Sequence, residues 1–165
     1  FDDSPYFETV VKYHTSGRLK VAPEHTEEHV LRLMRKPSFE MFERMNSRFN
    51  TICRREGLKY QLIPYFISSH PGCEERDMRA LADKVLGKLH FNLEQVQDLT
   101  PTPMTLSSVM FYMGENPYDG KEIYVARSQD DKRRQKSYFF ANKPTCATTP
   151  QPRKNGGKPH AKRRR

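Results

Sequence analysis

Two stretches of this 165-residue chain decide its fold: RLKVAPEHTEEHVLRLM at residues 18–34 and QLIPYFISSHPG at residues 61–72. Each begins with a short apolar run, passes through a polar turn that contains proline, and leads into a helical pattern. A third strand candidate, at 93–99, ends at the sequence TPTP, residues 100–103. Strands that alternate with helices in this way are typical of β-α-β units around a parallel sheet. The sequence therefore predicts an α/β fold.

Helical periodicity fills the segments between and after these runs. Thr26 is expected to cap a first helix, Ser38 a second helix that Gly57 ends, and a third helix is expected at about 74–89. Their inward faces consist of apolar residues: Val30, Leu31 and Met34; Phe42, Met45, Phe49, Ile52 and Cys53; Met78, Leu81, Ala82, Val85 and Leu89. Pro64 weakens the strand at 61–67, because a central strand cannot spare the N–H.

Two weaker elements follow the strand candidate at 93–99. Thr105 is expected to cap a short helical stretch that continues to Met113. Residues 122–126 form a less distinct strand candidate.

The charges divide the chain into a nearly neutral body and a basic tail. Residues 141–165 hold eight of the 29 Lys and Arg side chains and none of the 20 Asp and Glu, which leaves 21 basic and 20 acidic side chains in residues 1–140. The tail has almost nothing apolar with which to offset its ordering entropy, so we expect it to be disordered. It either gives weak affinity for RNA or the ribosome, or serves only as a solvated segment.

Membrane insertion and a disulfide framework are not expected. The longest apolar run spans six residues, 62–67, whereas a membrane-spanning helix needs about 20. The cysteines are odd in number (Cys53, Cys73 and Cys146) and fit a reducing cytoplasm. Cys53 lies on an apolar stripe and should be buried, whereas Cys73 follows a Pro-Gly turn and could be exposed.

Metal-binding patterns are weak. The sequence His25-Thr-Glu-Glu-His29 spells H-x-x-E-H, which occurs on the helices of some zinc peptidases. It stands at a helix start, where Thr26 is the expected cap, so His25 would lie outside the helix and a zinc site is disfavoured. No C-x-x-x-C-x-x-C spacing is present, so this chain holds no ligand set for an iron–sulfur cluster. We expect no metal ligands in it.

The polar loops after the three strands are the candidate ligand site. They comprise residues 23–26, 68–72 and 100–103. Ligands of parallel α/β folds bind at the carboxyl ends of the strands, so Glu24, Ser68 and His70 are candidates for hydrogen bonds to a ribose, an amino acid moiety or a base edge. The alternative is that these residues only form turns and helix caps, and the residues alone leave the two open.

Three separated stretches also resemble a known family. They are RLKVAPEHTEEHVLRLMRKPSFEMFERMN at 18–46, IPYFISSHPGCEERDM at 63–78 and VQDLTPTPMTLSSVMFYMGENPYDGKEIYVAR at 96–127. In this order they resemble the YgiQ family of uncharacterised radical SAM proteins, over roughly residues 1–140. The first two are also similar to the wider radical SAM and methylthiotransferase pattern, with 24–27 at its first turn and 69–72 at its second.

The resemblance implies the C-terminal portion of a partial (β/α)6 radical SAM barrel. In such enzymes a 4Fe-4S cluster, held by three cysteines, reductively cleaves S-adenosylmethionine, and the resulting radical abstracts hydrogen from substrate. The resemblance further implies that Glu24, His25, Ser68, Ser69 and His70 line the S-adenosylmethionine pocket.

The cluster loop and the first barrel strands of that family are missing from this sequence, which begins with Phe1. We therefore expect the C-terminal part of a longer protein: 1–100 as the last β/α units of the barrel, 101–140 as a family-specific extension, and 141–165 as the tail. The missing N-terminal part is the expected partner, and this chain alone is expected to be inactive. An unpaired first strand should make it marginally stable or self-associating. The alternative is a small α/β binding module whose basic arm binds RNA or the ribosome.

Overall fold

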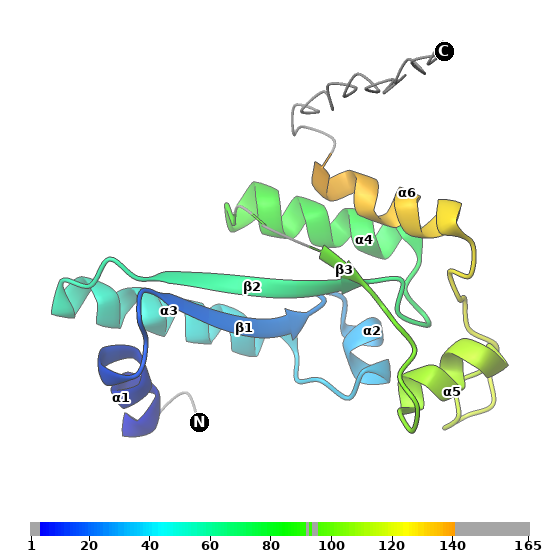
Figure 1. Cartoon of the computed structure of the whole chain (residues 1–165), viewed down its shortest axis with the longest axis horizontal. Helices are drawn as coiled ribbons and strands as arrows, with labels where there is room; N and C mark the ends of the chain where they lie inside the picture. The colour runs from blue at the N-terminus through cyan, green and yellow to red at the C-terminus, as the bar shows by residue number, and fades with distance from the viewer. Residues whose placement is uncertain (1–3, 92, 94–95, 141–165) are drawn as a thin grey trace, which may run out of the picture.

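The computed structural model describes residues 4–91, 93 and 96–140, which form an α/β fold (Figure 1). Its sheet has three parallel strands in the order β1-β2-β3, with β1 at Arg18–Glu24, β2 at Gln61–Ser68 and β3 at Val96–Asp98. The expected parallel sheet is confirmed, with β2 in the centre. The third strand lies within the strand candidate at 93–99 and is shorter than it. The barrel implied by the family resemblance stays a prediction, because the described residues form an open sheet.

The helices that the periodicity predicts are present. They are α2 (Glu28–Leu33), α3 (Phe39–Glu56), α4 (Glu75–Ala82), which continues in the π-helical turn η1 (Asp83–Lys88), and α5 (Leu106–Met113). Gly57 ends α3 in the left-handed conformation, with φ 65°, which glycine adopts at little cost. Thr105 caps α5, where its hydroxyl accepts a hydrogen bond from the Ser108 N–H. Thr26 does not cap α2: Glu27 occupies that position, and the Thr26 hydroxyl donates to the Glu27 carboxylate instead.

Two further helices, α1 (Pro5–Tyr13) and α6 (Gln129–Phe140), were not expected from the sequence. In α1, Phe7 and Val11 stand four residues apart and are the buried residues, and the helix contacts α3. In α6 only Gln135 and Phe139 are buried. Such narrow faces give little periodic signal, because most of each helix is polar or exposed.

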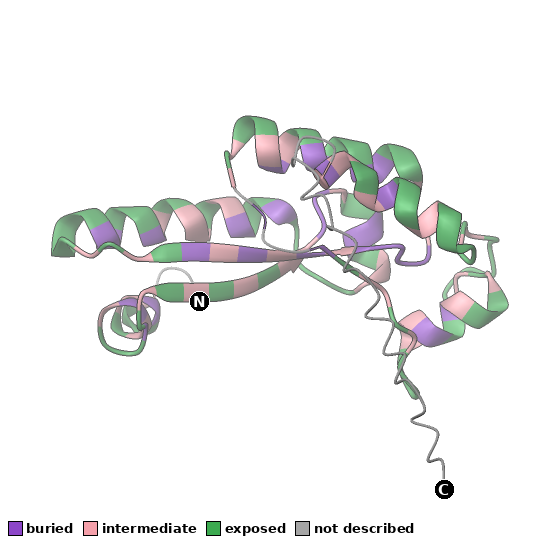
Figure 2. Cartoon of the chain, turned by 45° about the horizontal axis from the view of Figure 1, so that its top comes forward, coloured by how far each residue is buried: buried purple, intermediate pink, exposed green. Residues whose placement is uncertain are grey.

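The central strand tolerates its proline because of the pairing beside it. Pro64 stands opposite Val21, and the β1–β2 register becomes irregular immediately after that pair, between Val21 and Glu24. Proline is accepted in sheets at such irregularities, since the ladder there needs no N–H. Along β2, buried and half-buried residues alternate (Figure 2), as the pleat of a strand that is packed mainly on one face requires.

The core forms between this packed face and the helices. Its largest fully buried apolar side chains come from α2, α3, β2 and α4, and include Leu31, Phe49, Phe66, Met78 and Leu81. α4 and α6 contact each other (Figure 1). The inward residues of the expected helices are therefore largely confirmed as core.

Two expectations from the sequence are not confirmed. Residues 122–126 form no strand, because the structure has there only an isolated bridge from Glu122 to Glu115. The tail at 141–165, with Cys146, lies outside the described residues. None of the helices that the structure describes has both the length and the apolar composition needed to cross a membrane.

The core assignment of α3 is testable by a pair of substitutions on one helix. Phe49 is 1% exposed and Met41 is 43% exposed. We expect Phe49→Ala to lower the free energy of unfolding by about 3–5 kcal/mol, because it leaves a cavity, and Met41→Ala by less than about 1 kcal/mol. Urea denaturation followed by circular dichroism measures both. Equal losses would contradict the packing described for α3.

Candidate functional site

The carboxyl edge of the sheet carries unusual backbone conformations. Glu24 at the end of β1 has φ 67°, and Ser69 directly after β2 has φ 62°. A side chain in this left-handed region costs about 1–2 kcal/mol, and such strain concentrates at functional sites. The two strained residues are also two of the five that the family resemblance assigns to a cofactor pocket.

Glu24 keeps a partly accessible carboxylate at this edge. Its side chain is 16% exposed, and its Oε1 lies 3.5 Å from Lys36 Nζ. The same ammonium donates to the carbonyl oxygen of Ala22 at 3.3 Å. Burial raises the pKa of Glu24, while the charge of Lys36 acts in the opposite direction. The carboxylate can therefore accept hydrogen bonds from a ligand beside it.

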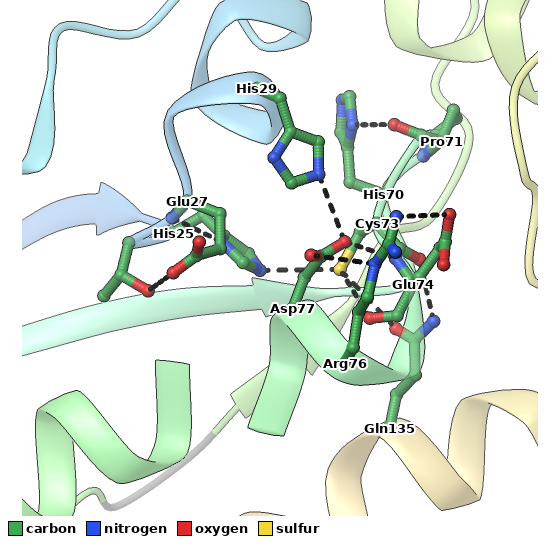
Figure 3. A network of polar contacts seen from close by, with 11 residues as sticks. His25, Glu27, His29, His70, Pro71, Cys73, Glu74, Arg76, Asp77 and Gln135 are labelled. Carbon is green, nitrogen blue, oxygen red and sulfur yellow. Dashed lines mark hydrogen bonds and ion pairs between the residues drawn. The ribbon is translucent and has the colours of Figure 1, made fainter. Parts of the chain in front are cut away.

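His25 is fully buried and pairs with Cys73 of the neighbouring loop (Figure 3). Its Nδ1 accepts the Glu27 N–H at 3.0 Å, and its Nε2 lies 3.4 Å from Cys73 Sγ. Burial lowers the pKa of His25 to about 4 and raises that of Cys73 far above its ordinary value. Both groups are thus neutral near pH 7, and the pair is no thiolate–imidazolium nucleophile. The sequence expectation that Cys73 could be exposed is wrong, because its exposed fraction is 0%.

Gln135 of α6 holds the loop between β2 and α4. Its Oε1 accepts the Ser69 N–H at 2.8 Å, and its Nε2 donates to the Cys73 carbonyl oxygen at 3.0 Å. Gln135 is 1% exposed, so these bonds form away from water. The Ser69 hydroxyl is also buried and has no hydrogen-bond partner within the part of the chain that is described.

Ser68 belongs to a second contact between α6 and the strands. The Ser68 hydroxyl donates to Asp98 Oδ1 at 2.7 Å, and Lys136 Nζ lies 2.7 Å from Asp98 Oδ2. Gln135 and Lys136 therefore fix the ends of β2 and β3 from one turn of α6. Sequence reasoning misses both, because they lie among the charged residues of KRRQK at 132–136, which give no sign of an inward face. The four-residue spacing from Gln135 to Phe139 is the signal that could have indicated an inward face.

His70 connects the same loop to α5. Its Nδ1 lies 2.8 Å from the Pro71 carbonyl oxygen and its Nε2 lies 2.9 Å from Ser107 Oγ. Burial lowers the pKa of His70. The arrangement fits a neutral ring that donates from Nδ1 and accepts the serine hydroxyl at Nε2.

The two histidines of the H-x-x-E-H sequence have different partners. His25 precedes α2 and faces Cys73, whereas the His29 Nε2 lies 3.2 Å from Asp77 Oδ2 on α4 (Figure 3). Asp77 also accepts the Glu74 N–H at 2.8 Å as part of a capping box. Among the described residues no group of three His, Cys, Asp or Glu side chains could hold a metal ion.

A cavity of about 430 Å³ lies between α2 and the loop that follows α5. Its lining combines basic, acidic, amide, aromatic and aliphatic side chains: His29, Arg32, Leu33, Asn116, Tyr118, Asp119, Lys121, Glu122 and Ile123. Residues 114–123 thus add accessible volume beside the carboxyl edge. The structure brings four of the predicted site residues together in a buried, mostly satisfied network, and leaves Glu24 partly accessible.

The two hydrogen bonds from Gln135 to Ser69 and Cys73, here called the Gln135 clamp, should contribute to the free energy of unfolding. Gln135→Leu keeps the approximate size of the side chain but leaves the Ser69 N–H and the Cys73 carbonyl without partners. Each buried group left unsatisfied costs about 1–3 kcal/mol, so we expect a lower urea midpoint. Gln129→Leu on the exposed start of the same helix is the control and should change the midpoint little. Equal midpoints for the two variants would show that the clamp does not hold the loop.

The buried His25 predicts a dependence of stability on pH. Its pKa is about 4 in the folded chain against an ordinary value of 6.5, so the unfolded chain takes up the proton first as the pH falls. This group should therefore lower the free energy of unfolding by about 2 kcal/mol between pH 7 and pH 5. Urea titrations of His25→Gln should lack that part of the pH dependence, whereas His14→Gln, at an exposed position, should retain it. An unchanged pH dependence in His25→Gln would contradict the prediction.

Comparison with known proteins places the chain among uncharacterised families. Residues 94–145 match the family model described as a domain of unknown function, DUF3362. A UPF0313 protein of Bacteroides thetaiotaomicron is 52% identical over 139 residues, which is 84% of this chain and 22% of the relative. One of Porphyromonas gingivalis is 53% identical over 135 residues, 82% of this chain and 21% of the relative. No solved structure matches the chain.

Each match covers a large share of this chain and a small share of the relative. The matches cover most of this chain, but the chain spans only about a fifth of the length of its curated relatives. A UPF0313 protein of the archaeon Methanocella arvoryzae shows the same pattern, with 44% identity over 79% of this chain and 22% of the relative. The chain belongs to the UPF0313 family, which is the YgiQ family that its sequence motifs resemble.

Proposed function

We propose that this chain is the C-terminal part of a radical SAM enzyme of the UPF0313 family. Its parallel sheet would supply the last strands of the barrel, and residues 101–140 a family-specific extension. The order of the three sequence motifs and the match to much longer relatives support this proposal. The substrate and the reaction that follows radical formation are left open.

The observation that carries the proposal is the pair of strained polar residues at the ends of adjacent parallel strands. Glu24 offers a partly accessible carboxylate, and Ser69 a buried hydroxyl without a partner among the described residues. The accessible carboxylate of Glu24 is an acceptor that fits the ribose hydroxyls and the amino group of S-adenosylmethionine, and the buried Ser69 belongs to the loop beside it. In this proposal Glu24 binds the cofactor directly, while Ser68, His25 and His70 hold the loops in place.

The iron–sulfur cluster does not fit the described part of this chain, where no suitable group of ligands occurs. Its cysteines would belong to the part of the longer protein that precedes this sequence. There the cluster would supply the electron for cleavage of S-adenosylmethionine. The described cysteines, Cys53 and Cys73, are free thiols, which supports a reducing, cytoplasmic location.

The longer protein that contains this chain tests the proposal. After anaerobic reconstitution with iron and sulfide, and with dithionite as reductant, we expect it to form 5′-deoxyadenosine from S-adenosylmethionine. Glu24→Gln should raise the KM for S-adenosylmethionine about tenfold or more, because a hydrogen bond to a charged group is lost, and should leave the iron content unchanged.

The matched control is Glu28→Gln, which removes an exposed carboxylate of α2 and should keep the KM of the wild-type protein. This chain alone, under the same treatment, should not acquire a stoichiometric cluster. A fully loaded longer protein that forms no 5′-deoxyadenosine would refute the proposed function, and uptake of four irons by this chain alone would refute its assignment as a partial enzyme.

A further inference from the structure

Exposed apolar side chains gather around α5. Of the nine large apolar side chains exposed in the described part of the chain, six lie between residues 104 and 124. We define the α5 patch as Met104, Val109, Tyr112 and Met113. Tyr112 is 70% exposed, Met113 is 61% exposed, and Met104 is fully exposed. Exposed apolar clusters of this kind mark interaction surfaces.

The composition of α5 indicates a covered helix. Its sequence, LSSVMFYM, lies within residues 99–114, which contain no charged side chain in a chain that is 30% charged. Met110 is fully buried on the inner side of α5, while the patch occupies the outer side. A helix that is apolar on both sides is normally buried on both. The outer side of α5 therefore has the composition of a buried surface but is exposed in this chain.

Several contacts fix the orientation of α5, so the patch cannot turn inward. The Ser107 hydroxyl lies 2.9 Å from His70 Nε2, and Arg127 Nη2 donates to the Tyr112 carbonyl oxygen at 3.1 Å. The Arg127 guanidinium also lies 5.5 Å from the centre of the Phe111 ring. These contacts hold α5 beyond the carboxyl ends of the strands (Figure 1).

The lack of charge limits the kind of partner. Nucleic acids are bound through Lys and Arg contacts to phosphates, which the patch does not offer, so its chemistry fits the apolar surface of a protein. Four side chains present on the order of a few hundred Å², whereas a stable complex of separate chains buries about 800 Å² on each partner. A segment of the same polypeptide needs less area, because covalent linkage gives it a high effective concentration.

We propose that the α5 patch packs against an apolar surface of the part of the longer UPF0313 protein that lies outside this chain. About four fifths of the length of the relatives lies outside the matched region. Because α5 is hydrogen-bonded to the loop that contains His70, this contact closes the carboxyl edge of the sheet. It also holds the extension at 101–140 over the candidate site. The inference rests on the proposal that this chain is part of such a longer protein.

Methionine oxidation in the longer protein tests the contact, because the patch contains its own probes. Hydrogen peroxide converts exposed methionines to sulfoxides, and peptide mass spectrometry gives the rate at each site. We expect Met113 to react as slowly as the buried Met110. Tyr112→Glu places a charge in the contact and should accelerate Met113 oxidation about fivefold or more, since reactivity follows exposure.

Tyr13→Glu is the matched control, because Tyr13 lies at the end of α1 and is 72% exposed; it should leave the Met113 rate unchanged. A wild-type Met113 that reacts as fast as in Tyr112→Glu would overturn the inference. Protection found only in a dimeric fraction from gel filtration would also overturn it, in favour of a second copy. Formation of 5′-deoxyadenosine is measured separately, so a protein that protects Met113 but cleaves no S-adenosylmethionine refutes the proposed function alone.

Discussion

The side-chain amide of Gln135 connects the last described helix, α6, to the loop between β2 and α4. Gln135, in a helix late in the chain, satisfies the Ser69 N–H and the Cys73 carbonyl in the loop after the central strand. Hydrogen bonds in a buried site are costly to leave unmade, so the conformation of that loop depends on α6 being in place. The strained φ of Ser69, the buried His25–Cys73 pair and the orientation of His70 all depend on the same loop. The C-terminal helix is thus a structural part of the candidate site.

The sequence was sufficient for the elements whose faces are broad and apolar. The sequence predicts α3 from a long apolar stripe at helical spacing, and β2 from a continuous apolar run. It was insufficient for α1 and α6, which bury two residues each. The irregular β1–β2 pairing beside Pro64 is not predictable from the sequence either, because it depends on how β1 pairs with β2.

The candidate site shows the same division. The loops after the strands and their polar residues were predicted from the rule that ligands bind at carboxyl ends. The roles of the individual residues were not, since burial decides them: His25 and Cys73 became a neutral pair, and Thr26 lost its capping position to Glu27. Gln135 and Lys136 were missed because their partners stand 66 and 38 residues away, at Ser69 and Asp98.

The raised pKa of the buried thiols has a consequence for metal selectivity. Burial raises the pKa of both Cys53 and Cys73, and only the deprotonated sulfur is a good ligand for iron. While the fold is intact, these two cysteines therefore compete poorly for metal ions. In a longer protein that holds the proposed cluster on a separate loop, iron would be directed to that loop, because the buried thiols would bind it poorly.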